Sequence, residues 1–177
     1  ITYPSGRQVA QSYDPIGRLS QITSGGTNYL SGVAYNAAHA PTGFTYGNGA
    51  QAAVAYNNRL QLQSLAYTQG ATKLLELAYS YTGHANGGNN GQITGITDST
   101  GTPEAGRSVN YTYDALHRLK TAITTGSTQY PQWGLSWTYD RYSNRTAQTV
   151  THGSGPPNSV TINAATNRIT DPGYSYD

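Results

Sequence analysis

The chain has 177 residues and a net charge of +2; only 10% of its residues are charged, while 21 are glycine and 16 are tyrosine. So small a charge, carried by arginines dispersed along the chain, argues against nucleic-acid binding. The absence of cysteine excludes a disulfide framework and a thiolate metal site, and no stretch approaches the roughly 18–20 apolar residues of a membrane helix.

The first predicted element is a tight turn at residues 13–19, which read Tyr-Asp-Pro-Ile-Gly-Arg-Leu. Asp at the first position of the turn, Pro at the second and Gly at the fourth are typical of a type I turn. The carboxylate of Asp14 can accept backbone N–H groups of its own turn. We therefore expect Asp14 to close the turn, with Tyr13 on the buried face just before it.

Further copies of this turn follow along the chain. Tyr35-Asn36 is a copy without arginine, and residues 56–60, Tyr-Asn-Asn-Arg-Leu, read as a shortened one. Residues 113–119 match 13–19 position for position, with His117 in place of Gly17. Residues 139–145 and 162–169 read as a form with one extra residue, the second without tyrosine, and the chain ends on Tyr176-Asp177. In the longer form Asn144 is expected to take the glycine position, because asparagine tolerates positive φ.

Several of these copies are 21 to 26 residues apart. A period of this size is typical of a repeat array, in which each unit is one supersecondary element that stacks on its neighbours.

Alternation of apolar and polar residues predicts strands on both sides of the turns. Val109, Tyr111 and Tyr113 share one face, and residues 75–81 and 135–139 alternate in the same way. Trp137 falls on the face of Tyr139 and is expected in the core. Residues 82–91 and 153–158 read as long hairpin loops, and no window of eleven residues carries a convincing helical stripe. The fold class predicted is all-β: a repeat array of antiparallel β-hairpins that forms a curved sheet or partial β-shell, since an open sheet of more than about ten strands curls.

The sequence contains no methionine, and we interpret residues 1–177 as a single repeat segment of a longer protein. Residues 1–3 and 174–176 are then expected to be open strand edges. Such edges can pair with the flanking repeats of the parent chain or with further copies of the segment.

No catalytic, cofactor-binding or metal site is predicted. Asp14, Asp114, Asp140 and Asp177 belong to turns, and the other carboxylates are Glu76, Asp98, Glu104 and Asp171. These read as solvated polar residues and not as a glycosidase-like acid/base pair. The histidines are His39, His84, His117 and His152; none of their spacings is that of a metal-binding pair. We therefore expect no enzyme activity, no cofactor and no bound metal.

Two aromatic features have a structural and a binding interpretation. The turn arginines are expected to stack on a neighbouring tyrosine or to pair with a turn aspartate, although they could also bind acidic partners or sugars. Trp133 follows Pro131 and is the residue we expect to be available for stacking on a carbohydrate ligand.

On these motifs the chain resembles the YD repeats of bacterial Rhs proteins, which are similar to the shells of insecticidal Tc-toxin C components and of animal teneurins. The pattern is a tyrosine, Asp or Asn, a short turn, an arginine, and then Leu or Ile, and its copies cover almost the whole chain. The resemblance implies these structural motif positions: Tyr13, Asp14, Gly17, Arg18, Tyr56, Asn57, Arg59, Tyr113, Asp114, Arg118, Tyr139, Asp140, Asn144, Arg145, Asn163, Asn167 and Arg168.

The resemblance also implies a function. Those families wind a long β-ribbon into a hollow shell, and in the polymorphic toxins the shell encloses a variable C-terminal toxin domain. The expectation is a structural shell segment of a large secreted or cell-surface protein, which encapsulates or displays a cargo or toxin domain that is not part of this chain. Two alternatives stay open: a subunit of a self-assembling extracellular filament, and an adhesin-like module that binds glycans or a protein.

Overall fold

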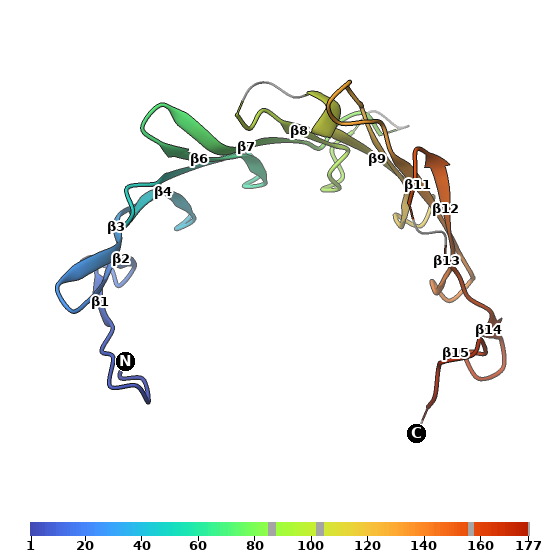
Figure 1. Cartoon of the computed structure of the whole chain (residues 1–177), viewed down its shortest axis with the longest axis horizontal. Coiled ribbons are helices and arrows are strands. Elements are labelled where there is room, and N and C mark those ends of the chain that lie inside the picture. Colours follow the sequence, from blue (N-terminus) through green and yellow to red (C-terminus); the bar gives the residue numbers. More distant parts are fainter. Residues whose placement is uncertain (85–87, 102–104, 156–157, 177) are drawn as a thin grey trace. The chain divides into compact units, whose positions relative to one another are not determined.

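The described residues fold mainly into short strands and turns (Figure 1). The computed structural model describes residues 1–84, 88–101, 105–155 and 158–176. Within these ranges the one helical element is a turn of 3-10 helix at Ala105–Arg107. The predicted all-β fold class is confirmed.

The chain forms two compact units, residues 1–79 with a short segment that begins at Asp98, and residues 80–97 with the C-terminal part. The strands whose residues lie wholly or mostly in the first unit are β1 (Ala10–Tyr13), β2 (Leu19–Ser24), β3 (Thr27–Tyr35), β4 (Pro41–Tyr46), β5 (Gln51–Tyr56), β6 (Leu62–Gln69) and β7 (Thr72–Ser80). Those of the second are β8 (Gly95–Asp98), β9 (Val109–Tyr113), β10 (Leu119–Thr124), β11 (Gly134–Tyr139), β12 (Arg145–His152), β13 (Asn158–Ser159), β14 (Ile162–Asn163) and β15 (Arg168–Ile169).

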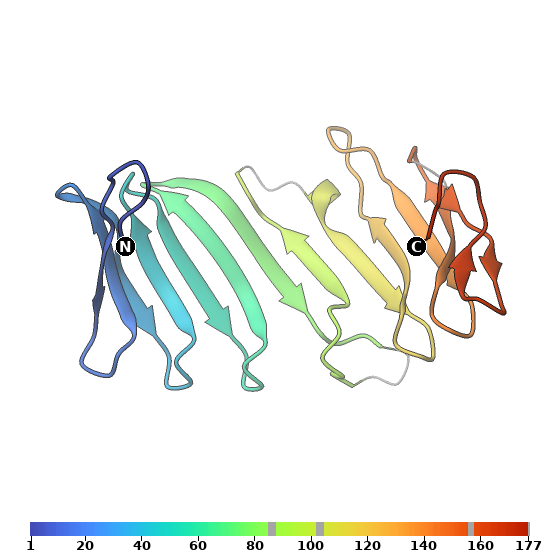
Figure 2. The same ribbon diagram turned by 90° about the horizontal axis from the view of Figure 1, so that it is seen from below.

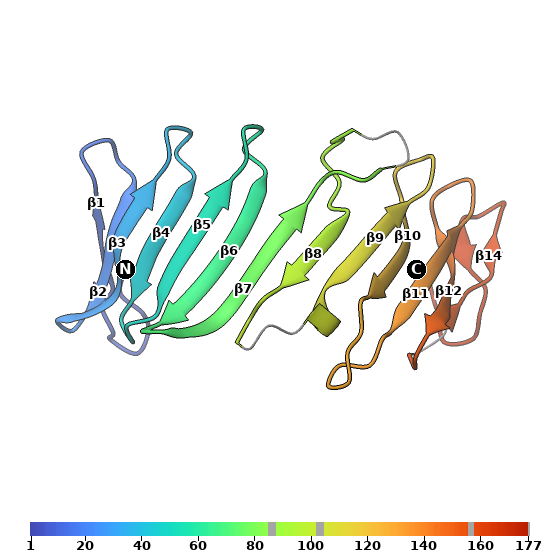
Figure 3. The ribbon, with the colours of Figure 1, turned by 90° about the horizontal axis from the view of Figure 1, so that it is seen from above.

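Within each unit, every strand pairs antiparallel with the next strand of the chain. β1 to β7 follow one another in this way, as do β8 to β13. β14 and β15 form a separate two-stranded sheet. Figure 2 and Figure 3 show the strands of each unit side by side in chain order. This is the predicted array of hairpins, and Figure 1 shows that the sheet of the first unit is bent along its length.

Each of these sheets is one layer thick, so the core of each unit is shallow. Among the residues described, the buried hydrophobic side chains are those of Ala50, Ala52 and Ala122, and no large side chain is fully buried. Trp137, expected in the core, is only half-buried, because no second layer covers its face; its Nε1 donates a hydrogen bond to Gln148 Oε1 at 2.8 Å. Stability must therefore come chiefly from contacts between neighbouring strands and turns.

Five of the repeated turns have the same length. The residue pairs that close them are Tyr13–Leu19, Tyr35–Pro41, Tyr56–Leu62, Tyr113–Leu119 and Tyr139–Arg145. The predictions of a shortened copy at residues 56–60 and of an extra residue in 139–145 are therefore wrong. The turn at residues 162–169 does have the extra residue, since Ile162 pairs with Ile169.

Strand register explains why the turn length is kept even where the sequence motif shifts. Side chains alternate between the two faces of a strand, so that a slip of one residue would move all of them to the opposite face. The position of an arginine in the sequence imposes no such constraint. The motif can therefore change residue types while the turn keeps its length.

A left-handed residue stands at the same position of each of these turns. Gly17 has φ 83° and His117 has φ 64°, as expected from the sequence, and Leu60 has φ 60°. In the turn of Asp140 the residue is Ser143, with φ 69°, and not Asn144. The expectation for Asn144 is wrong because this turn has the ordinary length.

Leu60 is the least suitable of these residues, because a leucine side chain gains nothing in the left-handed region and suffers its steric cost. Its replacement by asparagine, which tolerates positive φ, should raise the free energy of unfolding by about 0.5–1 kcal/mol. Chemical denaturation measures the change. Leu60→Ala keeps the steric cost and should give no such gain, and neither should Leu116→Asn in the next unit. Equal effects of Leu60→Asn and Leu60→Ala would contradict this interpretation.

Candidate functional site

The aspartate of each full repeat closes its own turn. Asp14 Oδ1 accepts the backbone N–H groups of Ile16 and Arg18 at 3.1 and 2.9 Å, and its Oδ2 accepts Arg18 Nε at 2.7 Å. Asp114 repeats the arrangement with Leu116 and Arg118, at 2.9, 2.9 and 2.7 Å. A charge-assisted contact of this kind adds to the turn hydrogen bonds that Asp and Asn commonly make.

In the turn of Asp140, a side-chain amide donates to the aspartate where a guanidinium donates in the turns of Asp14 and Asp114. Asp140 Oδ1 accepts the N–H groups of Tyr142 and Asn144 at 2.8 and 2.9 Å, and Asp140 Oδ2 accepts Asn144 Nδ2 at 2.8 Å. Asn144 therefore stands in the position of Arg18 and Arg118, which we call the arginine position. Arg145, assigned to this role by the sequence, instead begins β12.

Asparagine replaces aspartate in the turns of Asn36 and Asn57. Asn36 Oδ1 accepts the N–H groups of Ala38 and Ala40 at 2.9 and 3.0 Å. Asn57 Oδ1 accepts those of Arg59 and Gln61 at 2.9 and 3.1 Å, and Asn57 Nδ2 donates to Gln61 Oε1 at 2.7 Å. Gln61, and not Arg59, thus occupies the arginine position here.

Asn163 closes the longest of these turns. Its Oδ1 accepts the N–H groups of Ala165 and Thr166 at 2.9 and 3.2 Å. Asn167 has φ 55° and donates its backbone N–H to Asn163 O at 2.8 Å. Arg168 begins β15, and its guanidinium lies 5.0 Å from the centre of the Tyr176 ring.

The motif tyrosine of one hairpin ties it to the preceding turn. Tyr35 donates its hydroxyl to Leu19 O, and Tyr139 to Leu119 O, both at 2.7 Å. In each case the accepting carbonyl belongs to the residue that follows the arginine position. Two further hydroxyl donations have the same form, Tyr56 to Pro41 O at 3.1 Å and Tyr113 to Ile93 O at 2.7 Å.

The same tyrosine rings receive the arginines of the preceding turns. The Arg18 guanidinium lies 4.5 Å from the centre of the Tyr35 ring, and that of Arg118 lies 4.7 Å from the Tyr139 ring. Such cation–π contacts complete the link from one hairpin to the next. Tyr13 is the exception: it was expected to be buried but is 57% exposed, and its hydroxyl donates to Gln11 Oε1 and not to a turn carbonyl.

In the second unit the residue at the arginine position also reaches forward to the next turn. Gln92 Nε2 donates to His117 O at 2.8 Å, and Arg118 Nη1 donates to Asp140 O at 2.9 Å. Asn144 Nδ2 donates to Asn167 Oδ1 at 2.6 Å. We call this series of contacts between consecutive turns the turn ladder. Glutamine, arginine and asparagine side chains thus make the same kind of contact, each joining one turn to the next.

Sequence reasoning missed one member of the turn ladder and one further turn of the same form. Gln92 sits in a glycine-rich loop without a tyrosine–aspartate pair, so no local signal marks it. Residues 3–7, Tyr-Pro-Ser-Gly-Arg, form the same turn without an aspartate: Tyr3 N donates to Arg7 O at 2.9 Å and Gly6 has φ 80°. Their proline and glycine have the spacing of Pro15 and Gly17, which could have identified the turn.

The ends of the described chain are not the bare strands expected from the sequence. Ile1 donates its amino group to Val9 O at 2.8 Å, and Thr2 forms a bridge with Gln8. Residues 174–176 form no strand, and the Tyr176 hydroxyl accepts Ile169 N–H at 2.6 Å. Both segments therefore fold back on their own neighbours.

The turn carboxylates are held in their charged form. The backbone N–H of Arg18 is the main cause that lowers the pKa of Asp14, and the N–H of Arg118 does the same for the pKa of Asp114. The side-chain amide of Asn144 is the main cause that lowers the pKa of Asp140. A general acid needs the opposite shift, so these groups act as anchors for the turn.

The other carboxylates of the described residues have local partners. Glu76 pairs with Lys73, and Asp98 Oδ1 accepts Thr100 N–H at 2.9 Å. Asp171 Oδ2 accepts Thr161 N–H at 2.5 Å. Glu104 and Asp177 lie outside the described residues. Within the part of the chain that is described, no three His, Cys, Asp or Glu side chains are grouped for a metal ion, and no helix is long and apolar enough to cross a membrane.

Trp133, the residue expected to stack on a ligand, is 37% exposed. Its backbone N–H donates to Thr124 Oγ1 at 2.9 Å, which holds the residue just before β11.

Comparison with known proteins finds similarity in structure only. No family model and no curated protein matches the sequence. The fold is similar to a Photorhabdus luminescens Tc holotoxin pore with a mutation in TccC3, with a TM-score of 0.80 and 20% identity over 96% of this chain. It is also similar to a TcdB2–TccC3–TEV structure, with a TM-score of 0.79 and 20% identity over 95% of this chain. For TcdB2–TccC3 without its hypervariable C-terminal region, the TM-score is 0.76 and the identity is 19% over 93% of this chain. The chain spans only 9% of the length of each of these chains. It therefore shares the fold of a short stretch of these Tc-toxin proteins.

The tyrosine link can be tested by removing one hydroxyl. Tyr139→Phe deletes the donor to Leu119 O and leaves that half-buried carbonyl without it, and should lower the free energy of unfolding by about 0.5–1.5 kcal/mol. Tyr13→Phe is the matched control, because the Tyr13 hydroxyl bonds only to the exposed side chain of Gln11. Denaturant titration should show no measurable change for the control. Equal losses in the two variants would argue against the link.

The lowered carboxyl pKa values predict a direction of pH dependence. A group whose pKa is lower in the folded state contributes stability above its unfolded pKa, and loses it as the pH falls through the folded value. For Asp114 the unfolded value is 3.8, so the midpoint of thermal unfolding should fall as the pH is lowered from about 4. Asp114→Asn should flatten this dependence below pH 4. An unchanged profile in Asp114→Asn would contradict the anchoring role.

Proposed function

We propose that the chain is a structural segment in the wall of a β-shell, within a large secreted or cell-surface protein, and that this shell encloses a cargo or toxin domain. The observation that carries the proposal is the recurrence of one contact scheme in hairpin after hairpin: a turn closed by Asp or Asn, covered by the tyrosine of the next hairpin. The shared fold with Tc-toxin proteins over most of the chain supports it.

The charged side chains of the described residues are suited to a structural role in the wall of a shell. Asp14 and Asp114 pair with the arginines of their own turns, and Glu76 pairs with Lys73. The pKa shifts of Asp14, Asp114 and Asp140 favour permanent charge over proton transfer. A sheet one layer thick has two exposed faces, of which one can contact a cargo and the other solvent. The polar content of this chain fits such a sheet better than it fits a globular enzyme with a deep core.

Contacts at the turns would give the wall its continuity. In a hairpin array each unit touches only its neighbours, so the stability of the whole depends on the interfaces between consecutive units. The tyrosine links and the turn ladder supply these interfaces. On this proposal the partners of the segment are flanking repeats of the same polypeptide, or further copies, together with the enclosed domain.

The test uses the natural full-length protein that contains these residues. In native conditions the enclosed domain should resist protease, and Arg118→Ala combined with Asn144→Ala should increase its cleavage at least about tenfold, because both variants remove contacts between turns. Mass spectrometry of the fragments identifies the cut sites. Arg145→Ala is the control, since Arg145 lies outside the turn ladder and should leave protection unchanged.

Two other outcomes would sink the proposal. A domain that is cut as fast in the native protein as after denaturation is displayed and not enclosed. Growth of particle size with concentration for the 177-residue chain, together with fibres in electron micrographs, would favour the filament subunit instead.

A further inference from the structure

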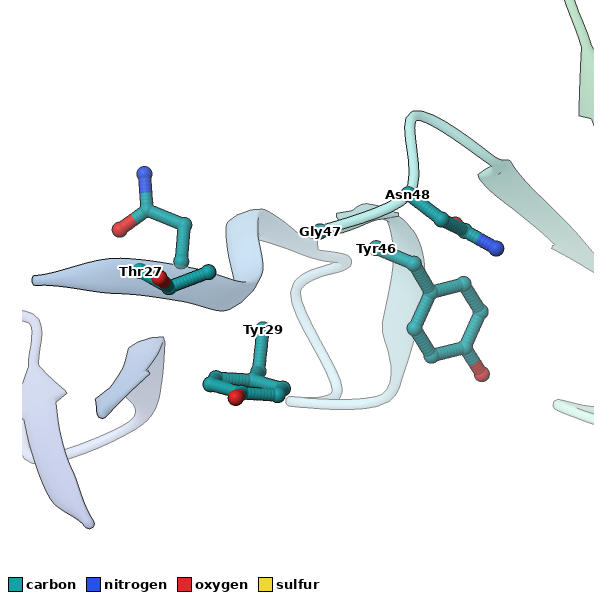
Figure 4. Close-up of a pocket in the computed structure, with 6 residues that line it drawn as sticks. Thr27, Tyr29, Tyr46, Gly47 and Asn48 are labelled. Atoms are coloured by element: carbon teal, nitrogen blue, oxygen red, sulfur yellow. The ribbon is translucent and has the colours of Figure 1, made fainter. Parts of the chain in front are cut away.

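An uncharged aromatic cleft lies at the edge of the first unit opposite to the motif turns. It has a volume of about 480 Å³ and is lined by Thr27, Asn28, Tyr29, Tyr46, Gly47 and Asn48. These residues come from the start of β3, the end of β4 and the turn between β4 and β5. Figure 4 shows the rings of Tyr29 and Tyr46 extending to the same side of the ribbon, with Gly47 between them.

A close contact between two backbone segments helps to set the geometry of the cleft. Gly47 N–H donates to Tyr29 O at 3.0 Å. A Cβ at Gly47 would lie 2.0 Å from Asn28 O, so any other residue would force the β4–β5 turn away from β3. Glycine is thus required here for the approach of the two segments.

Both aromatic rings are held from one side and remain exposed on another. Tyr46 packs on Tyr67, with ring centres 6.1 Å apart and planes at 27°, and contacts Phe44 edge-on at 5.1 Å. The Arg7 guanidinium lies 4.7 Å from the Tyr29 ring centre. Tyr29 is nevertheless 45% exposed and Tyr46 38%. Rings that are packed in place and still accessible form a preorganised surface on which the flat apolar face of a ligand can stack.

Amide groups at the rim supply hydrogen-bonding capacity. Asn28 Oδ1 accepts Gln21 Nε2 at 2.7 Å, and Asn48 Oδ1 accepts Ala50 N–H at 3.1 Å. These bonds use the carbonyl ends and orient the amides, so the N–H donors of both side chains stay available within the described structure. The rim therefore offers oriented donors beside two aromatic rings.

The charges decide what kind of ligand fits. No lining residue carries a charge, and the nearby Arg7 disfavours a cation from a partner, because like charges repel and no lining carboxylate offsets them. A neutral ligand with one apolar C–H face and several hydroxyl groups matches the rings and the amides. We propose that this cleft binds a neutral pyranose unit of a glycan, with Tyr46 and Tyr29 as stacking residues and Asn28 and Asn48 as hydrogen-bond donors.

The residues that line this cleft do not include Trp133, the residue that the sequence suggested. The proposal is independent of a role in a shell, because the cleft is formed within the first unit alone. A single small site of this kind should bind weakly, with Kd on the order of 1 mM.

The experiment is a titration of the isotope-labelled 177-residue chain with trisaccharides of glucose, galactose or N-acetylglucosamine, followed by amide NMR shifts. At least one sugar should move the signals of Gly47 and of the Asn28 and Asn48 side chains together. Tyr46→Ala should weaken binding at least tenfold. Tyr29→Leu should also weaken it, while Tyr29→Phe, which keeps the ring, should retain it.

Control variants separate this cleft from a general affinity of tyrosine-rich surfaces. Tyr142→Ala, which removes another exposed tyrosine, and Trp133→Ala should bind as the unaltered chain does. Because Tyr46→Ala also loses its contacts with Phe44 and Tyr67, the Asn28→Ala variant provides a second test that leaves the rings in place and should also weaken binding. Absence of shifts with all three sugars, tighter binding of free arginine than of any sugar, or loss of binding in Trp133→Ala would each overturn the proposal.

Discussion

The structure depends on one repeated hydrogen bond, from a tyrosine hydroxyl to the carbonyl of the preceding turn. Tyr35 and Tyr139 make it at 2.7 Å, and in both cases an arginine of the preceding turn stacks on the same ring. The bond joins two consecutive hairpins across an edge where the strand ladder has already ended. It also explains why tyrosine exceeds phenylalanine so strongly in this chain, 16 residues to 1: the ring gives contact area and the hydroxyl gives direction.

Such edge contacts matter because the sheet has little interior. The buried hydrophobic side chains among the described residues are alanines, which contribute little by burial. Cross-strand pairs and turn contacts must supply most of the remaining stability. A stack of hairpins with these properties gains stability from each added neighbour, which is why a continuous wall is a reasonable role for it.

The two edges of the first unit differ in chemistry. The motif turns on one edge use carboxylates and carboxamides to close on themselves, and their tyrosines face the neighbouring hairpin. On the opposite edge, the turn between β4 and β5 approaches β3 through Gly47 and leaves two aromatic rings accessible. The edge with the motif turns thus uses its side chains for contacts within the chain, while the opposite edge has an exposed surface that can bind a ligand.

The sequence by itself determined the hairpins, because turn chemistry and strand alternation are local: Asp14-Pro15-Ile16-Gly17 specifies its turn, and Val109, Tyr111 and Tyr113 specify a strand face. Only the tertiary structure decided the register, and with it that Asn144 and Gln61 occupy the arginine position, since pairing across strands fixes the turn length. Only the fold, likewise, could show that Gln92 reaches His117 and that Tyr29 and Tyr46 share a cleft. Those residues are distant in sequence, and the packing of neighbouring hairpins brings them together.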